Sequence, residues 1–232
     1  MKVKLLRYTP DPEILCAAAA LTSSRREGAS KTIEELTLER AREIIKRVIS
    51  YGHYSVIEHA SFTFSLEGVS RALTHQLVRH RLASYTQQSQ RYVAYNTLEH
   101  YVVPKTIQQN EEARKIFEDA LEKASEAYQK LLEMEIPKED ARFVLPHAAK
   151  TNIVVTMNAR ELRHFFNLRC CERSQWEIRE VAVEMLKQVK KVAPALFENA
   201  GPFCVEYGYC PEGKMKPATC NIQELKRRFS EL

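Results

Sequence analysis

The most constraining feature of this chain is a segment in which the hydrophobic period changes. From residue 60 to residue 67, apolar and polar side chains alternate, as they do in a strand with one buried face. The apolar members are Ala60, Phe62, Phe64 and Leu66. From Ser70 the spacing becomes helical, with Leu73 and Leu77 one turn apart and Leu82 as a further inward candidate. A strand with one apolar face needs a covering layer, so the sequence predicts helices packed on a sheet.

The rest of the sequence also predicts strands and helices, and no linker divides them into separate domains. Strands are predicted at 1–6, 92–95 and 151–157, and helices at 32–50, 70–83, 108–134, 138–145, from 158, and 175–193, with a loop from 84. We expect Thr32, Asn158 and Ser174 to cap helices, because each is followed three residues later by Glu. The sequence predicts one α/β domain over residues 1–232, with a modest, mainly antiparallel sheet packed by long helices.

The composition narrows the possible functions. The net charge of +5 and pI near 8.8 are mild for a dedicated nucleic-acid binder. The longest apolar run, residues 14–21, is far shorter than the roughly 20 residues of a membrane span, so we expect a cytoplasmic protein without a membrane partner. None of the six glycines forms GxGxxG or GxxxxGK[ST], which excludes a Rossmann fingerprint and a P-loop. A phosphate site would use side chains and helix ends.

The six cysteines do not define one site. Cys16 stands in an alanine-rich stretch and is expected in the core. Three more, Cys204, Cys210 and Cys220, fall in the tail after residue 201. Zinc with a fourth ligand from elsewhere, a disulfide and free thiols all remain open for them. The spacing lacks a C-x2-C pair, so we assign no metal site.

Residues 68–98 contain no Asp or Glu, although the chain has 30 acidic residues. This window holds Arg71, Arg79, Arg81 and Arg91. A guanidinium donates two parallel hydrogen bonds to a phosphate or carboxylate, so the window favours an anion brought from outside. A solvated helix face is the alternative interpretation.

The window also carries a family motif. Arg79-His80-Arg81 is followed, after seven residues, by Ser89. With this motif the chain resembles the flavin-dependent thymidylate synthases over nearly its whole length. Four further segments match in order: 53–55 with Glu58-His59; Gln76; 140–146; and 158–162 leading into 167–169 and 175–177.

The resemblance implies reductive methylation of dUMP to dTMP. Methylenetetrahydrofolate would supply the carbon, and bound FAD, reduced by NADPH, would supply the hydride. It also implies a homotetramer whose active sites are shared between subunits, with no nucleic-acid partner. The flavin pyrophosphate, the nucleotide phosphate and the folate glutamate are all anions, which would explain the window without carboxylates.

Site residues follow from the resemblance position by position. The FAD-binding positions are Ser55, Glu58, Arg79, His80, Arg81, Gln87, Asn158, Ala159, Arg160 and His164. The dUMP-binding positions are Gln76, Leu77, Val78, Arg79, Gln87, Gln88, Ser89, Gln90, Arg91, Arg142 and Arg169. His53 matches a ring close to the flavin and folate. Arg169 matches the catalytic residue, whose guanidinium would stabilise negative charge developing on the uracil.

Some positions depart from the family pattern or permit another reading. Gln87 stands where Glu is common, which puts a general-base role there in doubt. Ser89 could suggest a nucleophile, but no convincing base accompanies it, so the nucleotide-binding role is preferred. Arg163 and Arg179 are expected to be solvated or interface charges. The cysteine-containing tail, residues 201–232, has no role that the resemblance supplies.

Two other classes of function remain to be compared with this one. A nucleic-acid-binding module could use the Arg/Tyr/Gln stretch, and its affinity would fall steeply with salt. A metal-dependent hydrolase could use His53, Glu58 and His59, with His75 as a further ligand. Flavin absorbance in the purified protein would separate the three classes.

Overall fold

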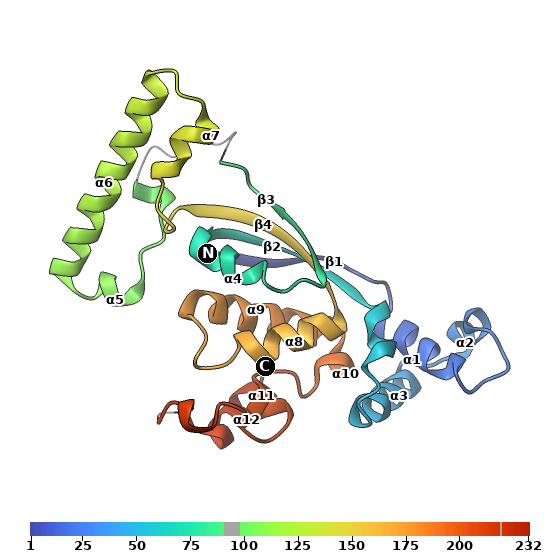
Figure 1. The fold of residues 1–232 in the computed structure, drawn as a ribbon. Helices are drawn as coiled ribbons and strands as arrows, with labels where there is room; N and C mark the ends of the chain where they lie inside the picture. Colours follow the sequence, from blue (N-terminus) through green and yellow to red (C-terminus); the bar gives the residue numbers. More distant parts are fainter. Residues whose placement is uncertain (91–97, 219) are drawn as a thin grey trace. The chain divides into compact units, whose positions relative to one another are not determined.

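The computed structural model describes residues 1–90, 98–218 and 220–232 (Figure 1). Its strands are β1 (Lys2–Tyr8), β2 (Ser61–Ser70), β3 (Ala83–Gln87) and β4 (Lys150–Asn158). The α-helices are α1 (Pro12–Thr22), α2 (Ala29–Glu35), α3 (Leu38–Ser50), α4 (Arg71–Leu77), α5 (Lys105–Gln108), α6 (Glu111–Glu133), α7 (Lys138–Ala141), α8 (Ala159–Arg169), α9 (Trp176–Val192), α10 (Pro194–Phe197), α11 (Phe203–Glu206) and α12 (Ile222–Ser230). Short 3-10 helices are η1 (Tyr54–His59), η2 (Leu98–His100), η3 (Arg142–Val144) and η4 (Gly213–Met215).

The four strands form one antiparallel sheet in the order β1-β2-β4-β3. The central strands β2 and β4 alternate buried and more exposed positions, which is why the period-2 pattern is visible in the sequence. Within the described residues, no helix is long and apolar enough to cross a membrane.

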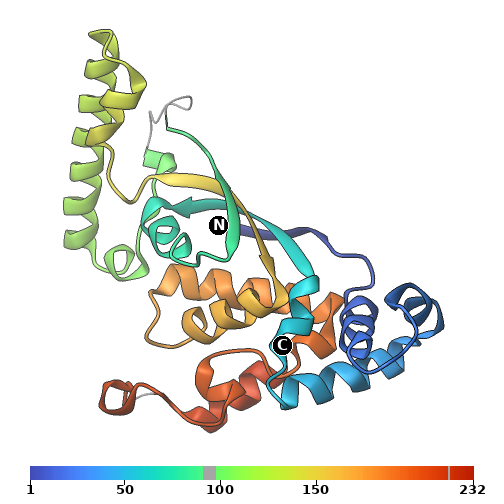
Figure 2. The ribbon, with the colours of Figure 1, turned by 45° about the vertical axis from the view of Figure 1, so that its right-hand side comes forward.

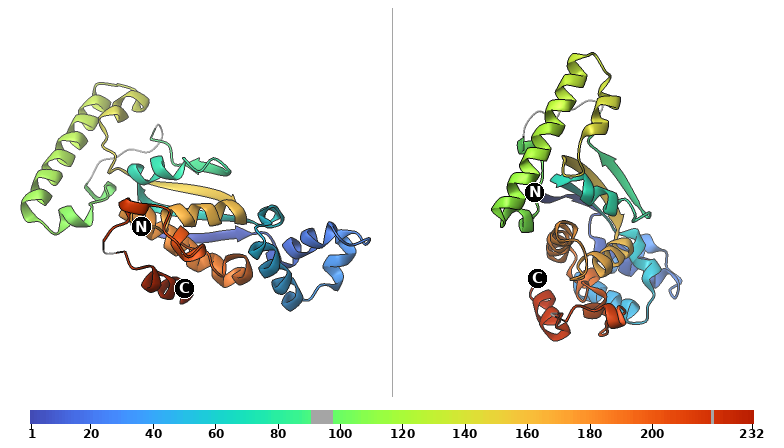
Figure 3. Two further views of the ribbon diagram at one scale, coloured as in Figure 1. Left: turned by 60° about the horizontal axis from the view of Figure 1, so that its bottom comes forward. Right: turned by 60° about the vertical axis from the view of Figure 1, so that its left-hand side comes forward.

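The described chain divides into two compact units. Unit one comprises residues 1–2, 66–79 and 86–154, and unit two comprises 3–65, 80–85 and 155–232. The core of unit one lies under the long helix α6, where Leu121 and Tyr128 are buried with Tyr101, Ala141 and Ala149. Figure 3 shows α7 returning alongside α6. Leu121 and Tyr128, two turns apart on α6, therefore form its buried face.

Unit two has an aromatic core. The ring of Phe62 on β2 packs edge-on against Phe197 of α10 at 5.4 Å, and Phe166 of α8 meets Phe197 at 6.0 Å. Phe165 packs against Phe166. Figure 2 shows α8 and α9 lying side by side in this unit. Such edge-to-face pairs add to the free energy of apolar burial and fix α8 in place.

Several predicted features are confirmed. The strand at 60–67 is β2, the strand at 151–157 is β4, and Phe62, Phe64 and Leu66 are fully buried. Asn158 caps α8, since its side-chain oxygen accepts a hydrogen bond from the Glu161 N–H at 2.9 Å. Cys16 is buried in α1, as expected.

Two of the predicted caps are wrong. Thr32 lies inside α2, where its hydroxyl donates to the Gly28 carbonyl, and Thr37 caps the following helix α3 instead. The second correction concerns α9, where the side chain of Gln175, rather than Ser174, accepts hydrogen bonds from the first turn. In both cases a neighbouring polar side chain has the non-helical backbone that a cap requires.

The helix predicted at 70–83 is also too long. It ends at Leu77, and residues 83–87 form β3 where a loop was predicted. Leu82, expected to pack inward, is 73% exposed. The polar composition of this edge strand conceals it from a hydrophobic pattern. The strand predicted at 92–95 lies outside the described residues.

The cap at Thr37 gives a first prediction. Thr37→Ala should lower the free energy of unfolding by about 1 kcal/mol, because the Arg40 N–H loses its acceptor. Chemical denaturation measures this loss. The matched control is Thr22→Ala, whose hydroxyl donates to a carbonyl within α1 and whose loss should change stability by less than about 0.5 kcal/mol. Equal losses in both variants would contradict the capping role.

Candidate active site

A buried chain of hydrogen bonds in unit two joins residues from three of the motif segments named from the sequence. His80 is 4% exposed. Its Nδ1 lies 3.2 Å from Glu161 Oε1, and Arg169 Nε donates to its Nε2 at 3.0 Å. Because Nε2 accepts, the ring proton resides on Nδ1 and is donated to Glu161. His80 therefore links Glu161, at the start of α8, to Arg169, at its end.

The electrostatics of this group favour a neutral imidazole. Burial, followed by the charges of Arg169 and His164, lowers the pKa of His80 to about 4. Burial also raises the pKa of Glu161. The contact between His80 and Glu161 is thus a hydrogen bond donated by a neutral ring and not an ion pair. Arg169 keeps its positive charge, because a guanidinium does not deprotonate in proteins.

Neighbouring side chains fix the orientation of His80. The Tyr85 hydroxyl donates to the His80 carbonyl at 2.7 Å, and burial raises the pKa of this tyrosine. Phe165 packs edge-on against the imidazole at 5.0 Å, and the ring of His164 lies at 5.8 Å. These contacts restrain His80, so its hydrogen bond can set the position of the Arg169 guanidinium.

The predicted FAD-binding residues of unit two lie largely at its surface. Ser55, Arg81 and His164 are exposed, as is His53. Glu58 and Arg160 form a partly exposed ion pair at 2.5 Å, which joins η1 to the first turn of α8. His80 differs from them, because both of its ring nitrogens are already bonded. The other predicted FAD-binding residues of unit two include two accessible guanidinium groups, those of Arg81 and Arg160. Two such groups suit a pyrophosphate such as that of FAD.

Unit one carries most of the predicted dUMP-binding residues. The Gln87 amide donates to Thr74 Oγ1 at 2.9 Å and to Thr151 Oγ1 at 3.4 Å. An ionised Glu at this position could only accept, so the amide has a donor role that the commoner residue lacks. The carbonyl of Gln88 accepts from Arg71 Nη2 at 2.7 Å.

Arg71 has one further property that favours an external acceptor. Its Nε is buried and has no hydrogen-bond partner among the described residues. A buried donor without an acceptor costs about 1–3 kcal/mol, so such groups call for an explanation. Arg71 belongs to the predicted anion window, and its unused N–H fits that interpretation.

The other predicted dUMP-binding residues of unit one differ in burial and in hydrogen bonding. Gln76 donates to the Ala72 carbonyl at 3.4 Å, and Arg142 Nε donates to the Glu139 carbonyl at 2.9 Å. Leu77 is fully buried, so its side chain packs in the core. Val78 and Arg79 are exposed, while Ser89 and Gln90 are partly buried. Arg91 lies outside the described residues.

Sequence reasoning missed several partners of these residues. Glu161 was recognised only as a capping residue, although its carboxyl group accepts from His80. Thr74 and Thr151 were not singled out. For Glu161 the sequence signal was its place among the motif residues of the helix, next to Arg160, whereas the hydroxyl partners gave no signal.

The structure corrects the expectation for Arg163 and gives the tail, residues 201–232, a structural role. Arg163 is not a solvated charge: with 5% of its side chain exposed, it pairs with Glu206 of α11 at 2.6 Å. Asn167, one turn further along α8, donates to the second oxygen of Glu206 at 2.6 Å and to the Gly201 carbonyl at 2.9 Å. The guanidinium also stacks over Tyr54 at 5.7 Å. The tail thus anchors α8 through Glu206.

The alternative metal site finds no support in the structure. Throughout residues 1–90, 98–218 and 220–232, no group of three or more His, Cys, Asp or Glu side chains could hold a metal ion. His53, Glu58 and His59 are all exposed. The tail residues Cys204, Cys210 and Cys220 are free thiols.

Comparison with known sequences gives consistent matches. A family model described as thymidylate synthase complementing protein matches residues 4–195. The flavin-dependent thymidylate synthase of Geobacter sulfurreducens is 53% identical over 100% of this chain and 99% of its own length. Those of Clostridium tetani and Pyrococcus abyssi are 48% and 45% identical, over 93% and 100% of this chain and 92% and 98% of their own lengths.

Solved structures with a similar fold give the same picture. A flavin-dependent thymidylate synthase from Helicobacter pylori, complexed with FAD and dUMP, is 26% identical, with a TM-score of 0.70 over 87% of this chain and 100% of that one. A UMP/dUMP methylase from Streptomyces cacaoi, bound with 5-Br dUMP, is 25% identical, with a TM-score of 0.72 over 85% of this chain and 93% of that one.

Proposed function

This chain belongs to the flavin-dependent thymidylate synthase family, and on that premise we propose that it catalyses the reductive methylation of dUMP to dTMP. FAD is its cofactor, and methylenetetrahydrofolate and NADPH are its co-substrates. The observation that carries the proposal is the position of Arg169, held by the neutral, buried ring of His80.

Arg169 is proposed as the catalytic residue. It is fixed before the reaction begins, because its Nε is already bonded to His80. Its charge is therefore available, without reorganisation, to stabilise negative charge that develops on the uracil ring. Since His80 is neutral, it does not compete with the substrate for that charge. His80 acts as a positioning residue for Arg169.

FAD, when bound, supplies the hydride that reduces the one-carbon unit. We propose that it is held by Ser55, Glu58, Arg79, Arg81, Gln87, Asn158, Ala159, Arg160 and His164, with His80 behind them. Arg81 and Arg160 provide the charges for its pyrophosphate. His53 is proposed to lie close to the flavin and the folate.

For dUMP we propose phosphate and base contacts at the positions that family membership implies, in addition to Arg169. These are Gln76, Leu77, Val78, Arg79, Gln87, Gln88, Ser89, Gln90, Arg91 and Arg142. Because the Leu77 side chain is buried, its contribution is proposed to come from the backbone. Ser89 is assigned to binding and not to nucleophilic attack.

The assembly and its setting are further proposals that rest on family membership. We propose a cytoplasmic homotetramer, formed from single-domain chains of residues 1–232, in which subunits share active sites. Sedimentation of the purified holoenzyme tests the assembly: a mass four times that of the chain is expected.

An anaerobic assay tests the proposed reaction. Purified protein, dUMP, methylenetetrahydrofolate and NADPH are combined, and dTMP is measured by chromatography. Product should form, and the protein should show flavin absorbance. Omission of each reactant in turn is the control. A folded, flavin-loaded protein that makes no dTMP in the complete mixture would overturn the proposal.

Arg81 gives a separate prediction for the cofactor. Arg81→Ala should weaken FAD binding about tenfold to a hundredfold, because a charged hydrogen bond to a phosphate is worth about 1.5–3 kcal/mol. Titration of the flavin-free variant with FAD, followed by fluorescence, measures this. The control is Arg114→Ala, an exposed arginine paired with Glu118 in unit one, which should bind FAD normally. Unchanged affinity in the Arg81 variant would remove this contact from the proposal.

A further inference from the structure

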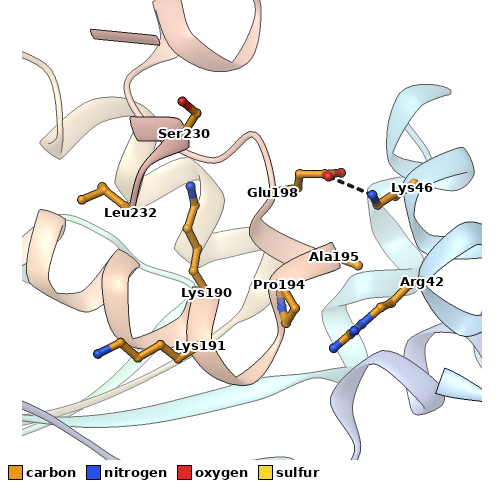
Figure 4. Close-up of a pocket in the computed structure, with 9 residues that line it drawn as sticks. All are labelled: Arg42, Lys46, Lys190, Lys191, Pro194, Ala195, Glu198, Ser230 and Leu232. Atoms are coloured by element: carbon orange, nitrogen blue, oxygen red, sulfur yellow. Dashed lines mark hydrogen bonds and ion pairs between the residues drawn. The ribbon is translucent and has the colours of Figure 1, made fainter. Parts of the chain in front are cut away.

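A cavity in unit two shares no lining residue with the set assigned to catalysis, and several of its lining side chains are basic. Its volume is about 390 Å³, within the usual range for small-molecule sites. Four cationic residues line it, from α3 and from the end of α9: Arg42, Lys46, Lys190 and Lys191. The rest of the lining is Pro194, Ala195, Glu198, Ser230 and Leu232 (Figure 4).

Two of the four cations that line this cavity are held in ion pairs. Arg42 is paired with the buried Glu13 at 2.7 Å, and Lys46 is paired with Glu198 at 2.8 Å. Among the described residues, neither Lys190 nor Lys191 has a carboxylate within ion-pair distance. In the part of the chain that the structure describes, two ammonium groups beside the cavity therefore lack a carboxylate in direct contact, an arrangement that favours an anionic ligand.

Lys190 is the residue best placed to bind such a ligand. Burial lowers the pKa of Lys190, and its ammonium donates to the Phe229 carbonyl at 2.5 Å. An ammonium has three N–H donors, and within the described chain the Phe229 carbonyl is its hydrogen-bond acceptor. Figure 4 shows this side chain directed toward Ser230 and Leu232, with the Lys46–Glu198 pair opposite.

A simpler explanation is that Lys190 and Lys191 only complement the negative end of the α9 helix dipole. That effect is worth about 0.3–1 kcal/mol for an exposed cation at a helix C-terminus. This effect accounts for the basic residues in the last turn of α9, and ion pairs account for Arg42 and Lys46. Neither effect by itself places cations from two helices around one cavity. The apolar lining from Pro194, Ala195 and Leu232 also suits a ligand that has an organic part.

We propose that this cavity binds a small phosphate-bearing anion, distinct from FAD and dUMP, between α3, α9 and α10. Such a ligand would connect α3 to the end of α9. The chain passes from α3 directly into η1, whose Glu58 pairs with Arg160 of α8. Anion binding would therefore stabilise the segment that carries the proposed flavin contacts Ser55 and Glu58.

The experiment uses the holoenzyme, loaded with FAD and saturated with dUMP so that both proposed phosphate sites are filled. Inorganic pyrophosphate is titrated in at constant ionic strength and followed by calorimetry. Binding should weaken at least tenfold in Lys190→Gln and in Lys46→Gln. Lys46 is about half exposed, so the second variant should fold even if the first does not. Loss of the Lys46 ammonium also leaves Glu198 without its ion-pair partner, and the Glu198 carboxylate then repels the anion.

Lys187→Gln is the matched control, because Lys187 stands one turn earlier on α9, pairs with Glu184 and does not line the cavity. It should bind pyrophosphate as the unaltered protein does. Equal affinity in all variants, or no saturable heat in the unaltered protein, would overturn the proposal. A parallel arm offers vesicles containing phosphatidic acid; binding to vesicles without binding to pyrophosphate would also overturn the assignment to a small soluble anion.

Discussion

Arg169→Ala should reduce dTMP formation by about a hundredfold to a thousandfold while the enzyme keeps most of its FAD. The expected size is that of removing one preorganised donor from a site where negative charge develops. The structure supports a selective effect, because the Arg169 Nε is held by His80 and its charge is not offset by that neutral ring. Single-turnover kinetics and flavin absorbance of the same preparation measure the two quantities.

Arg173→Ala is the control for this experiment. Arg173 follows closely after α8, is partly exposed and pairs with Glu212. Its loss should change turnover by less than about threefold, because a surface ion pair contributes little. A parallel loss of FAD and turnover in the Arg169 variant would mean that Arg169 acts in cofactor binding and not on the uracil. Thermal unfolding of both variants separates either result from a loss of structure.

Glu206→Gln should lower the free energy of unfolding by about 3–5 kcal/mol. The variant leaves the Arg163 guanidinium buried without a counter-charge, at a site where both side chains are about 95% covered. It also weakens the hydrogen bond from Asn167 to the second oxygen of Glu206. Denaturation of the flavin-loaded enzyme, compared with the unaltered protein, measures the loss.

Two further variants define the cause of that loss. Glu212→Gln removes the partner of Arg173 at the surface and should cost no more than about 1 kcal/mol. The double variant Glu206→Leu with Arg163→Met removes both buried charges and should recover much of the stability lost in Glu206→Gln. A single variant within about 1 kcal/mol of the unaltered protein would show that the pair is not a main anchor of α8.

Sequence patterns predicted the elements whose structure is set by residues close together in the chain. Phe62 and Phe64 alternate with polar residues because only one face of β2 is buried. Asn158 caps α8 because its own side chain reaches an N–H three residues later. The errors arose where two neighbours could fulfil the same role, as with Ser174 and Gln175, or where the side chains of an edge strand are polar on both faces, as in β3.

The candidate site was predicted as a set of positions and not as a set of contacts. The motif identified His80 and Arg169, but their hydrogen bond joins residues 89 positions apart. Glu206 and Arg163 are 43 positions apart, and neither stands in a pattern that suggests burial. Pairings of this kind depend on how the helices pack, which residue spacing along one helix does not determine.

The attachment of Glu206 to α8 has an evolutionary consequence. A buried guanidinium cannot persist once its counter-charge has gone, so positions 163 and 206 should mutate together. In a relative that lacks the segment equivalent to α11, we expect a neutral side chain at position 163, or an acidic residue brought there from another part of its chain. An alignment of full-length relatives would reveal this covariation, and arginine kept at 163 without any compensating acid would disprove it.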